Sequence, residues 1–160
     1  MKSRSLKAVY LFTAMAMILC LFTACGDKKT ASTVDFEYLA SDNGYIVEDA
    51  SDLFAAYDYI KFATIAAPKS QSYQIEFYEL SDESFAASFF SINKNNLQMM
   101  KSADAIETNK SGGNYDLFKI ESDSKYMMIE RVENTVVFVD KTDIKCKKEI
   151  EAFLKELNYL

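Results

Sequence analysis

Apolar residues recur at helical spacing in three stretches of the chain. They predict helices over 33–43, 82–100 and 143–157. Ser, Thr or Asp precedes each stretch, and these residue types cap helix N-termini. The second stretch has the widest apolar face, which indicates that it packs on a sheet.

Runs rich in β-branched and aromatic residues separate the predicted helices. In residues 73–77, Tyr, Ile and Phe alternate with Gln74 and Glu76, which predicts a strand with one core face and one wetter face. Residues 102–114 contain almost no large apolar side chain and are predicted to form the longest loop. The predicted strands lie at 45–47, 57–67, 73–77, 115–121, 126–132 and 135–140.

Together these elements predict an α+β domain over residues 33–160. We expect a largely antiparallel sheet of about six strands with helices on one face, in the order α-βββ-α-βββ-α. The second and third helices then share a face, and Gln74, Glu76 and Tyr78 look out from the other face. Two pseudo-symmetric βββα halves are an alternative, although the halves share little sequence identity.

The first 25 residues have the pattern of a secretory signal. Lys2, Arg4 and Lys7 precede a 17-residue run without charge, and the run ends in Thr-Ala before Cys25. An uncleaved membrane helix is the alternative, because 17 residues is the lower limit for spanning a bilayer. The small residues before the cysteine and the polar chain after it resemble the lipobox of bacterial lipoproteins.

This resemblance implies cleavage before Cys25 and a diacylglyceryl group on its thiol. Residues 1–24 would then be a lipoprotein signal peptide, and 25–32 would be the lipidated cysteine and a short polar tether. The protein would be anchored to the cell membrane by lipid and would face outside the cytoplasm. The domain behind the tether resembles small lipoproteins of Gram-positive-type bacteria that carry no motif of known activity.

Charge and composition exclude several classes of function. The chain has no His, which removes His-based triads and His-zinc sites. After Cys25 there are 15 basic and 24 acidic residues, a net charge of −9, and this charge argues against nucleic acid as a partner. No ligand spacing for a metal is recognisable, and no cofactor is expected.

Tyrosines on the predicted strands and one arginine are the candidate ligand-binding residues. Tyr57, Tyr59 and Tyr78 each join an apolar ring to a hydroxyl, which suits a sugar, peptide or protein surface, although such rings also line ordinary cores. Arg131 could clamp a carboxylate or could pair with a neighbouring acid. Cys146 is expected on the buried stripe of the last helix, as a small hydrophobe and not as a nucleophile.

These observations favour a membrane-anchored extracytoplasmic binding or interaction module over an enzyme, with no catalytic residue assigned. An envelope protein, peptide or saccharide that is neutral or cationic is the expected partner. The alternative is a carboxylate-dependent hydrolase acting on envelope polymers, which requires two acids facing each other across a cleft.

Overall fold

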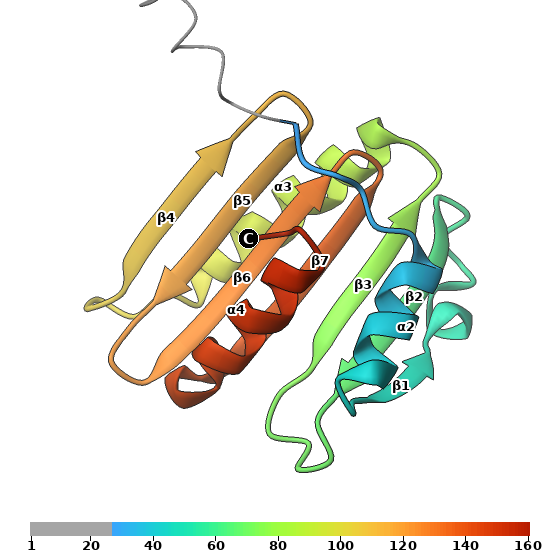
Figure 1. The fold of residues 1–160 in the computed structure, drawn as a ribbon. Helices are drawn as coiled ribbons and strands as arrows, with labels where there is room; N and C mark the ends of the chain where they lie inside the picture. Colours follow the sequence, from blue (N-terminus) through green and yellow to red (C-terminus); the bar gives the residue numbers. More distant parts are fainter. Residues whose placement is uncertain (1–26) are drawn as a thin grey trace, which may run out of the picture.

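Seven strands form one antiparallel sheet in the order β1-β2-β3-β7-β6-β5-β4 (Figure 1). The computed structural model describes residues 27–160, so the predicted signal peptide and Cys25 lie outside the described residues. The strands are β1 (Ile46–Asp49), β2 (Ile60–Ala67), β3 (Ile75–Leu80), β4 (Ile106–Ser111), β5 (Tyr115–Glu121), β6 (Lys125–Val132) and β7 (Thr135–Asp143). The helices are α2 (Thr33–Asp42), α3 (Glu83–Met99) and α4 (Lys147–Glu156), with short 3₁₀ helices η1 (Ser51–Phe54) and η2 (Ile144–Cys146).

The predicted α+β class and antiparallel pairing are confirmed, but the element order is different. The additional strand is β4, which lies where the sequence predicts the longest loop. It pairs with β5 along its length, from Ile106 opposite Glu121 to Ser111 opposite Asp116. Most of its side chains are exposed, so it has no apolar alternation, and main-chain hydrogen bonds hold it at the edge of the sheet.

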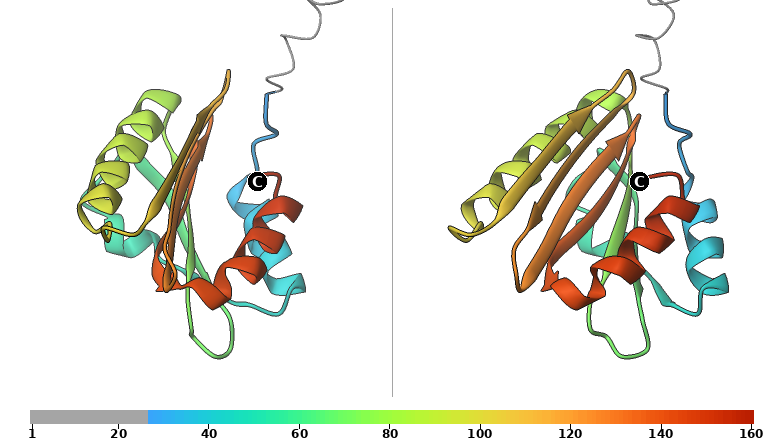
Figure 2. Two further views of the ribbon diagram at one scale, coloured as in Figure 1. Left: turned by 90° about the vertical axis from the view of Figure 1, so that its left-hand side faces the viewer. Right: turned by 60° about the vertical axis from the view of Figure 1, so that its left-hand side comes forward.

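Helices cover both faces of the sheet, and the prediction that they share one face is wrong. Figure 2 shows α3 on one side of the strands and α2 with α4 on the other. The reason lies in strands such as β6, where Tyr126 and Met128 pack with α4, while Met127 and Ile129 pack under α3. If a two-fold axis normal to the sheet related two βββα halves, their closing helices would lie on the same face. Because α3 and α4 lie on opposite faces, no such axis relates the halves.

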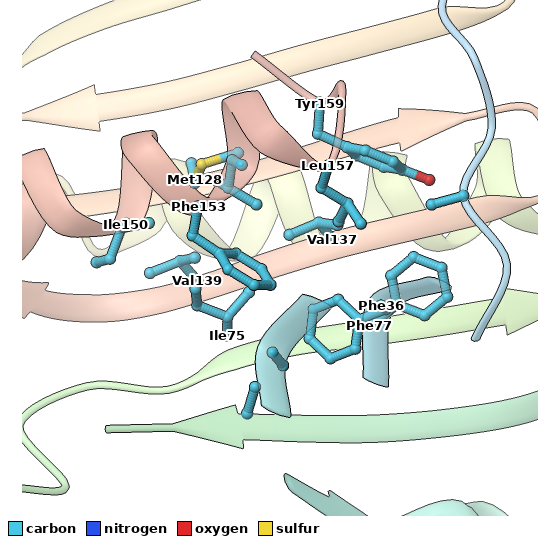
Figure 3. Close-up of a cluster of buried hydrophobic side chains, with 14 of the residues drawn as sticks. Phe36, Ile75, Phe77, Met128, Val137, Val139, Ile150, Phe153, Leu157 and Tyr159 are labelled. Atoms are coloured by element: carbon cyan, nitrogen blue, oxygen red, sulfur yellow. The ribbon is translucent and has the colours of Figure 1, made fainter. Parts of the chain in front are cut away.

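The core between the sheet and the helices α2 and α4 is rich in aromatic rings (Figure 3). Phe36 of α2 stacks on Phe77 of β3, with the ring centroids 4.9 Å apart. Phe153 of α4 meets Phe36 edge-on at 5.6 Å. The two helices therefore share one continuous core instead of packing on the sheet independently.

The opposite core lies under α3, where Ala86, Phe90 and Leu97 are buried. Tyr78 of β3 is only 6% exposed in this cluster, so the expectation that it looks out from an uncovered face is wrong. Gln74, near the start of the strand and away from α3, is exposed as expected.

Capping side chains define the helix starts close to the predicted positions. The Ser32 side chain accepts from the Asp35 amide, and the Asp35 carboxylate accepts from the Ser32 amide in return. Asp82 accepts from the first amides of α3, and Asp143 caps the short η2 turn that leads into α4. Gly44, at φ 78°, ends the first helix where the sequence predicts a left-handed stop.

Candidate functional site

A hollow lined by aromatic side chains lies between α3 and the segment that joins η1 to β2. We call it the aromatic groove, and its volume is about 420 Å³. The residues that line it are Phe54, Tyr57, Tyr59, Ile60, Phe85, Ser88, Phe89, Ile92 and Asn93.

One wall of the groove is the segment around Tyr57 and Tyr59. Short hydrogen bonds fold it tightly, from the Tyr57 amide to the Phe54 carbonyl at 2.8 Å and from the Ile60 amide to the Tyr57 carbonyl at 2.9 Å. The Tyr59 carbonyl accepts from the Ser81 amide at 2.8 Å, which ties this wall to the start of α3. The wall is therefore ordered by backbone contacts on both sides.

The other wall is the part of α3 that the sheet leaves uncovered. Phe85, Phe89 and Ile92 follow at helical spacing beside the buried stripe of the same helix. Phe85 is 43% exposed and Ile92 is 61% exposed. The wide apolar face that the sequence predicts for this helix thus serves both the core and the groove.

Ring contacts join the two walls. Tyr59 stacks on Phe85 with centroids 5.2 Å apart and ring planes 8° from parallel, and Tyr57 lies 5.7 Å from Tyr59. Tyr57 is 49% exposed. Within residues 27–160 no hydrogen bond occupies the hydroxyl of Tyr57 or Tyr59, so both are available to a ligand.

Tyr78 forms the floor beneath these walls. Its ring contacts Phe89 at 4.8 Å and Phe54 at 5.4 Å. Its hydroxyl donates to the Glu76 carboxylate, and burial raises the pKa of this phenol well above its ordinary value. Tyr78 therefore supports the groove from below and is not itself exposed to a ligand.

The structure brings three of the four candidate ligand-binding residues together. Tyr57 and Tyr59 line the aromatic groove, and Tyr78 lies beneath it. Arg131 is elsewhere, on β6, where its guanidinium contacts Asp116 at 2.9 Å and donates to the Glu133 carbonyl at 3.1 Å. Arg131 therefore pairs with a neighbouring acid, which is one of its two expected roles.

Sequence reasoning missed the helical half of the groove. The apolar face of residues 82–100 predicts packing on the sheet, yet on this face Phe85 is exposed and Phe89 is half-buried. The signal was the width of the apolar face of α3, since a helix on a flat sheet buries only a narrow stripe.

A second hollow of about 510 Å³ lies at the opposite end of the sheet from the start of α3. Glu48 of β1 and Asp140 of β7 both line it. Two acids from different strands therefore share one concave surface here. Both side chains are exposed, so neither experiences the burial that tunes a catalytic acid against its base.

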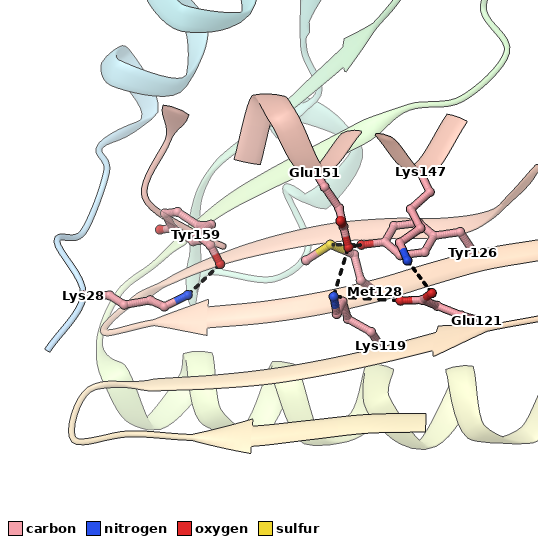
Figure 4. A network of polar contacts seen from close by, with 8 residues as sticks. All are labelled: Lys28, Lys119, Glu121, Tyr126, Met128, Lys147, Glu151 and Tyr159. Atoms are coloured by element: carbon pink, nitrogen blue, oxygen red, sulfur yellow. Dashed lines mark hydrogen bonds and ion pairs between the residues drawn. The ribbon is translucent and has the colours of Figure 1, made fainter. Parts of the chain in front are cut away.

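A charged network on the α4 face fastens that helix to the sheet (Figure 4). Lys119 of β5 pairs with Glu151 of α4 at 3.0 Å, and Lys147 pairs with Glu121. The buried Tyr126 hydroxyl donates to Glu151, and burial raises the pKa of this phenol above its ordinary value. Each charge has an opposite partner, which indicates a structural network and not a reactive one.

A buried ion pair joins the N-terminal segment to β6. Lys28 contacts one oxygen of Glu130, a side chain with no exposed surface, and the other oxygen of this carboxylate has no hydrogen-bond partner within the described chain. Burial raises the pKa of Glu130 to about 7, although the contact with Lys28 lowers it.

This raised pKa predicts that stability falls as the pH rises. Between the unfolded pKa of the carboxyl, near 4.5, and the folded value of about 7, the folded state binds more protons. We expect Glu130 to make the free energy of unfolding about 2–3 kcal/mol lower at pH 8 than at pH 5. Urea unfolding of residues 27–160 at several pH values measures this. Glu130→Gln removes the titrating group and should flatten the profile, whereas an unchanged profile would contradict the assignment.

Cys146 lies at the start of α4 and is half-buried, so it is more accessible than the sequence suggests. It packs beside the core between the sheet and the helices α2 and α4.

In residues 27–160 no group of three His, Cys, Asp or Glu side chains is placed to hold a metal ion. None of the helices in this part of the chain is long and apolar enough to cross a membrane.

Comparison with protein-family models, curated proteins and solved structures gave no match.

Proposed function

We propose that this protein is a membrane-anchored, extracytoplasmic binding module whose aromatic groove takes an apolar peptide segment of a neutral or cationic partner. The observation that supports this is the gathering of Tyr57, Tyr59 and Phe85 at an exposed hollow, where rings are left without cover. Exposed rings around a concave surface are typical of recognition sites.

The groove is better suited to an apolar segment than to a saccharide. Its two polar side chains on α3 are engaged with the helix itself, because Ser88 donates to the Ser84 carbonyl and Asn93 donates to the Phe89 carbonyl, both at 2.9 Å. Sugar recognition needs hydrogen-bond donors and acceptors around the rings, and here Tyr57 and Tyr59 offer only two hydroxyls.

The acidic surface restricts the partner further. The net charge of −9 after Cys25 repels anionic polymers and attracts cationic segments. An envelope protein with an apolar segment flanked by Lys or Arg meets both requirements.

Lipid anchoring through Cys25 is part of the same proposal and is supported by the N-terminal sequence. Intact mass of the protein from the membrane fraction should show loss of residues 1–24 and a diacylglyceryl adduct. Cys25→Ala should accumulate as an unlipidated precursor. An unmodified full-length chain from wild-type cells would contradict the anchor.

The rival function is hydrolysis by a carboxylate pair, with Glu48 and Asp140 as the pair that shares a hollow. A hydrolase screen on envelope fragments with residues 27–160 separates the two proposals. Turnover that Asp140→Asn abolishes would favour the hydrolase and contradict the binding module.

We expect the double substitution Tyr57→Ser and Phe85→Ser to weaken partner capture at least about tenfold. The reason is that each exposed ring at the centre of a small interface contributes about 1–2 kcal/mol. The measurement is capture of envelope proteins and peptides by immobilised residues 27–160. Ile106→Ser is the matched control, because Ile106 is a 72% exposed apolar side chain on β4 and outside the groove. Equal capture by all variants would mean that the groove is not the site.

A further inference from the structure

The described chain is fixed to the domain from its second residue. The Lys28 ammonium pairs with the buried Glu130, donates to the Tyr159 carbonyl at 2.7 Å and lies 4.8 Å from the centre of the Tyr115 ring. The partners come from β6, the C-terminal segment and β5, so one side chain joins three separate parts of the fold. Figure 4 shows the bond from Lys28 to Tyr159.

The main chain of the same segment is also bonded. Asn114 accepts from the Lys28 amide at 2.9 Å and donates to the Lys28 carbonyl at 2.8 Å. Two residues later, the Thr30 hydroxyl donates to Glu133 at 2.6 Å, and Ala31 is buried in the core. The sequence predicts residues 25–32 as a tether, yet residues 28–31 belong to the packed domain.

The chain between Cys25 and the first of these contacts is therefore short. Three residue steps separate Cys25 from Lys28, a reach of about 10 Å when fully extended. If Lys28 and Thr30 were released, the chain would be free as far as Ala31, six steps away, and the reach would be about 20 Å.

The contacts of Lys28 lie at one end of the sheet. We call this the hairpin end, because the turns at 112–114 and 133–134 meet there, and the segment 27–32, drawn in blue, runs beside it (Figure 2). The turns at 68–72 and 122–124 lie at the opposite end, about 27 Å away along the eight residues of β6.

We infer that Lys28 clamps the hairpin end of the sheet against the lipid headgroups, so that the membrane surface is the partner of this end and the domain stands in one orientation. The inference rests on the proposed lipid anchor at Cys25. The hairpin end presents uncharged Gly112, Gly113 and Asn114 at its tip to a headgroup layer, and the acid in its second turn, Glu133, is bonded to Thr30 and Asn114.

The clamp also sets where the aromatic groove opens. Asn134, in the second turn of the hairpin end, donates to the Leu80 carbonyl at 3.0 Å, and α3 begins three residues beyond Leu80. The stacked Tyr59 and Phe85 lie at that start. The partner segment would then be one that lies close to the bilayer.

Energy transfer from a single tryptophan measures the orientation, because the chain has no Trp of its own. Asn109→Trp places the donor near the hairpin end, and Ser70→Trp places it at the opposite end; both side chains are exposed. The full chain, lipidated in a bacterial host, is purified from the membrane fraction and reconstituted in vesicles that carry a dansyl group on a fraction of the lipid headgroups.

We expect several-fold greater transfer to the dansyl lipid from position 109 than from position 70. The triple variant Lys28→Gln/Thr30→Ala/Asn114→Ala removes the side-chain and main-chain contacts of the segment and should make the two positions similar, since the longer tether lets the domain turn. Loss of the lysine removes the contact that lowers the pKa of Glu130, so this buried carboxyl is protonated more readily and the variant carries no unpaired buried charge. Asn114→Ala alone breaks only the two main-chain bonds of Lys28 and should reduce the difference less. Lys29→Gln removes the same charge from an exposed neighbour and should leave the difference intact.

Intact mass of each sample separates the two possible failures. An unmodified Cys25 would overturn both the anchor and the clamp. A lipidated protein with equal transfer from positions 109 and 70 would overturn the clamp alone, as would an unequal transfer that the triple variant does not change.

Discussion

Alanine at either Phe77 or Phe118 will lower the free energy of unfolding by about 3–5 kcal/mol. Both rings have no exposed surface, but they lie on opposite faces of the sheet. Phe77 stacks on Phe36 of α2, whereas Lys94 of α3 covers the ring of Phe118 at 5.3 Å. Each substitution leaves a cavity under a different helix. Similar losses of unfolding free energy at the two sites would therefore show that helices cover both faces of the sheet.

Urea unfolding of residues 27–160 is the measurement. Phe62→Ala is the control, because Phe62 is 50% exposed and its removal should cost less than about 1 kcal/mol. A loss at Phe77 without a comparable loss at Phe118 would mean that α3 does not cover its face.

The second large effect is expected at Tyr159, next to the C-terminus. Its side chain is fully buried, its ring lies 6.3 Å from that of Phe77, and its hydroxyl bonds to Thr135. Tyr159→Ala should lower the free energy of unfolding by about 3–5 kcal/mol, a large value for a residue outside any helix or strand.

Tyr159→Phe separates the two parts of this effect. It keeps the ring and removes only the hydroxyl, so it should cost about 1 kcal/mol. A cost for phenylalanine as large as that for alanine would mean that the hydrogen bond to Thr135, and not packing of the ring, holds the C-terminal segment.

The sequence predicts most of the elements but not the two covered faces. The missed evidence is in the strands after position 125, where Met127, Met128 and Ile129 form an unbroken apolar run. Such a run indicates a strand that is buried on both sides. The alternation at 73–77 instead suggested a wet face, because Gln74 is exposed and Glu76 is only partly buried.

β4 and the N-terminal segment could not be predicted for a different reason. An edge strand in water needs no hydrophobic period, and its pairing partner is chosen by the hairpin at Gly112-Gly113. The docking of Lys28 depends on Glu130, 102 positions away, and no local pattern reports such a contact. The groove was predictable in part, through Tyr57 and Tyr59. Its helical wall was signalled only by the width of the apolar face of α3, which does not tell which of its side chains the sheet leaves exposed.

The meeting of Lys28 with the Tyr159 carbonyl also fixes an order of events as the chain folds. The two residues are 131 positions apart, so Lys28 gains this bond only after β7 and α4 have been synthesised and packed. β3 pairs with β7, so this pairing also requires the later part of the chain. It joins the meander of β1–β3 to the meander of β4–β7. We therefore expect the two hairpin-rich halves to form early and locally, their union to be slower, and Lys28 to dock after it.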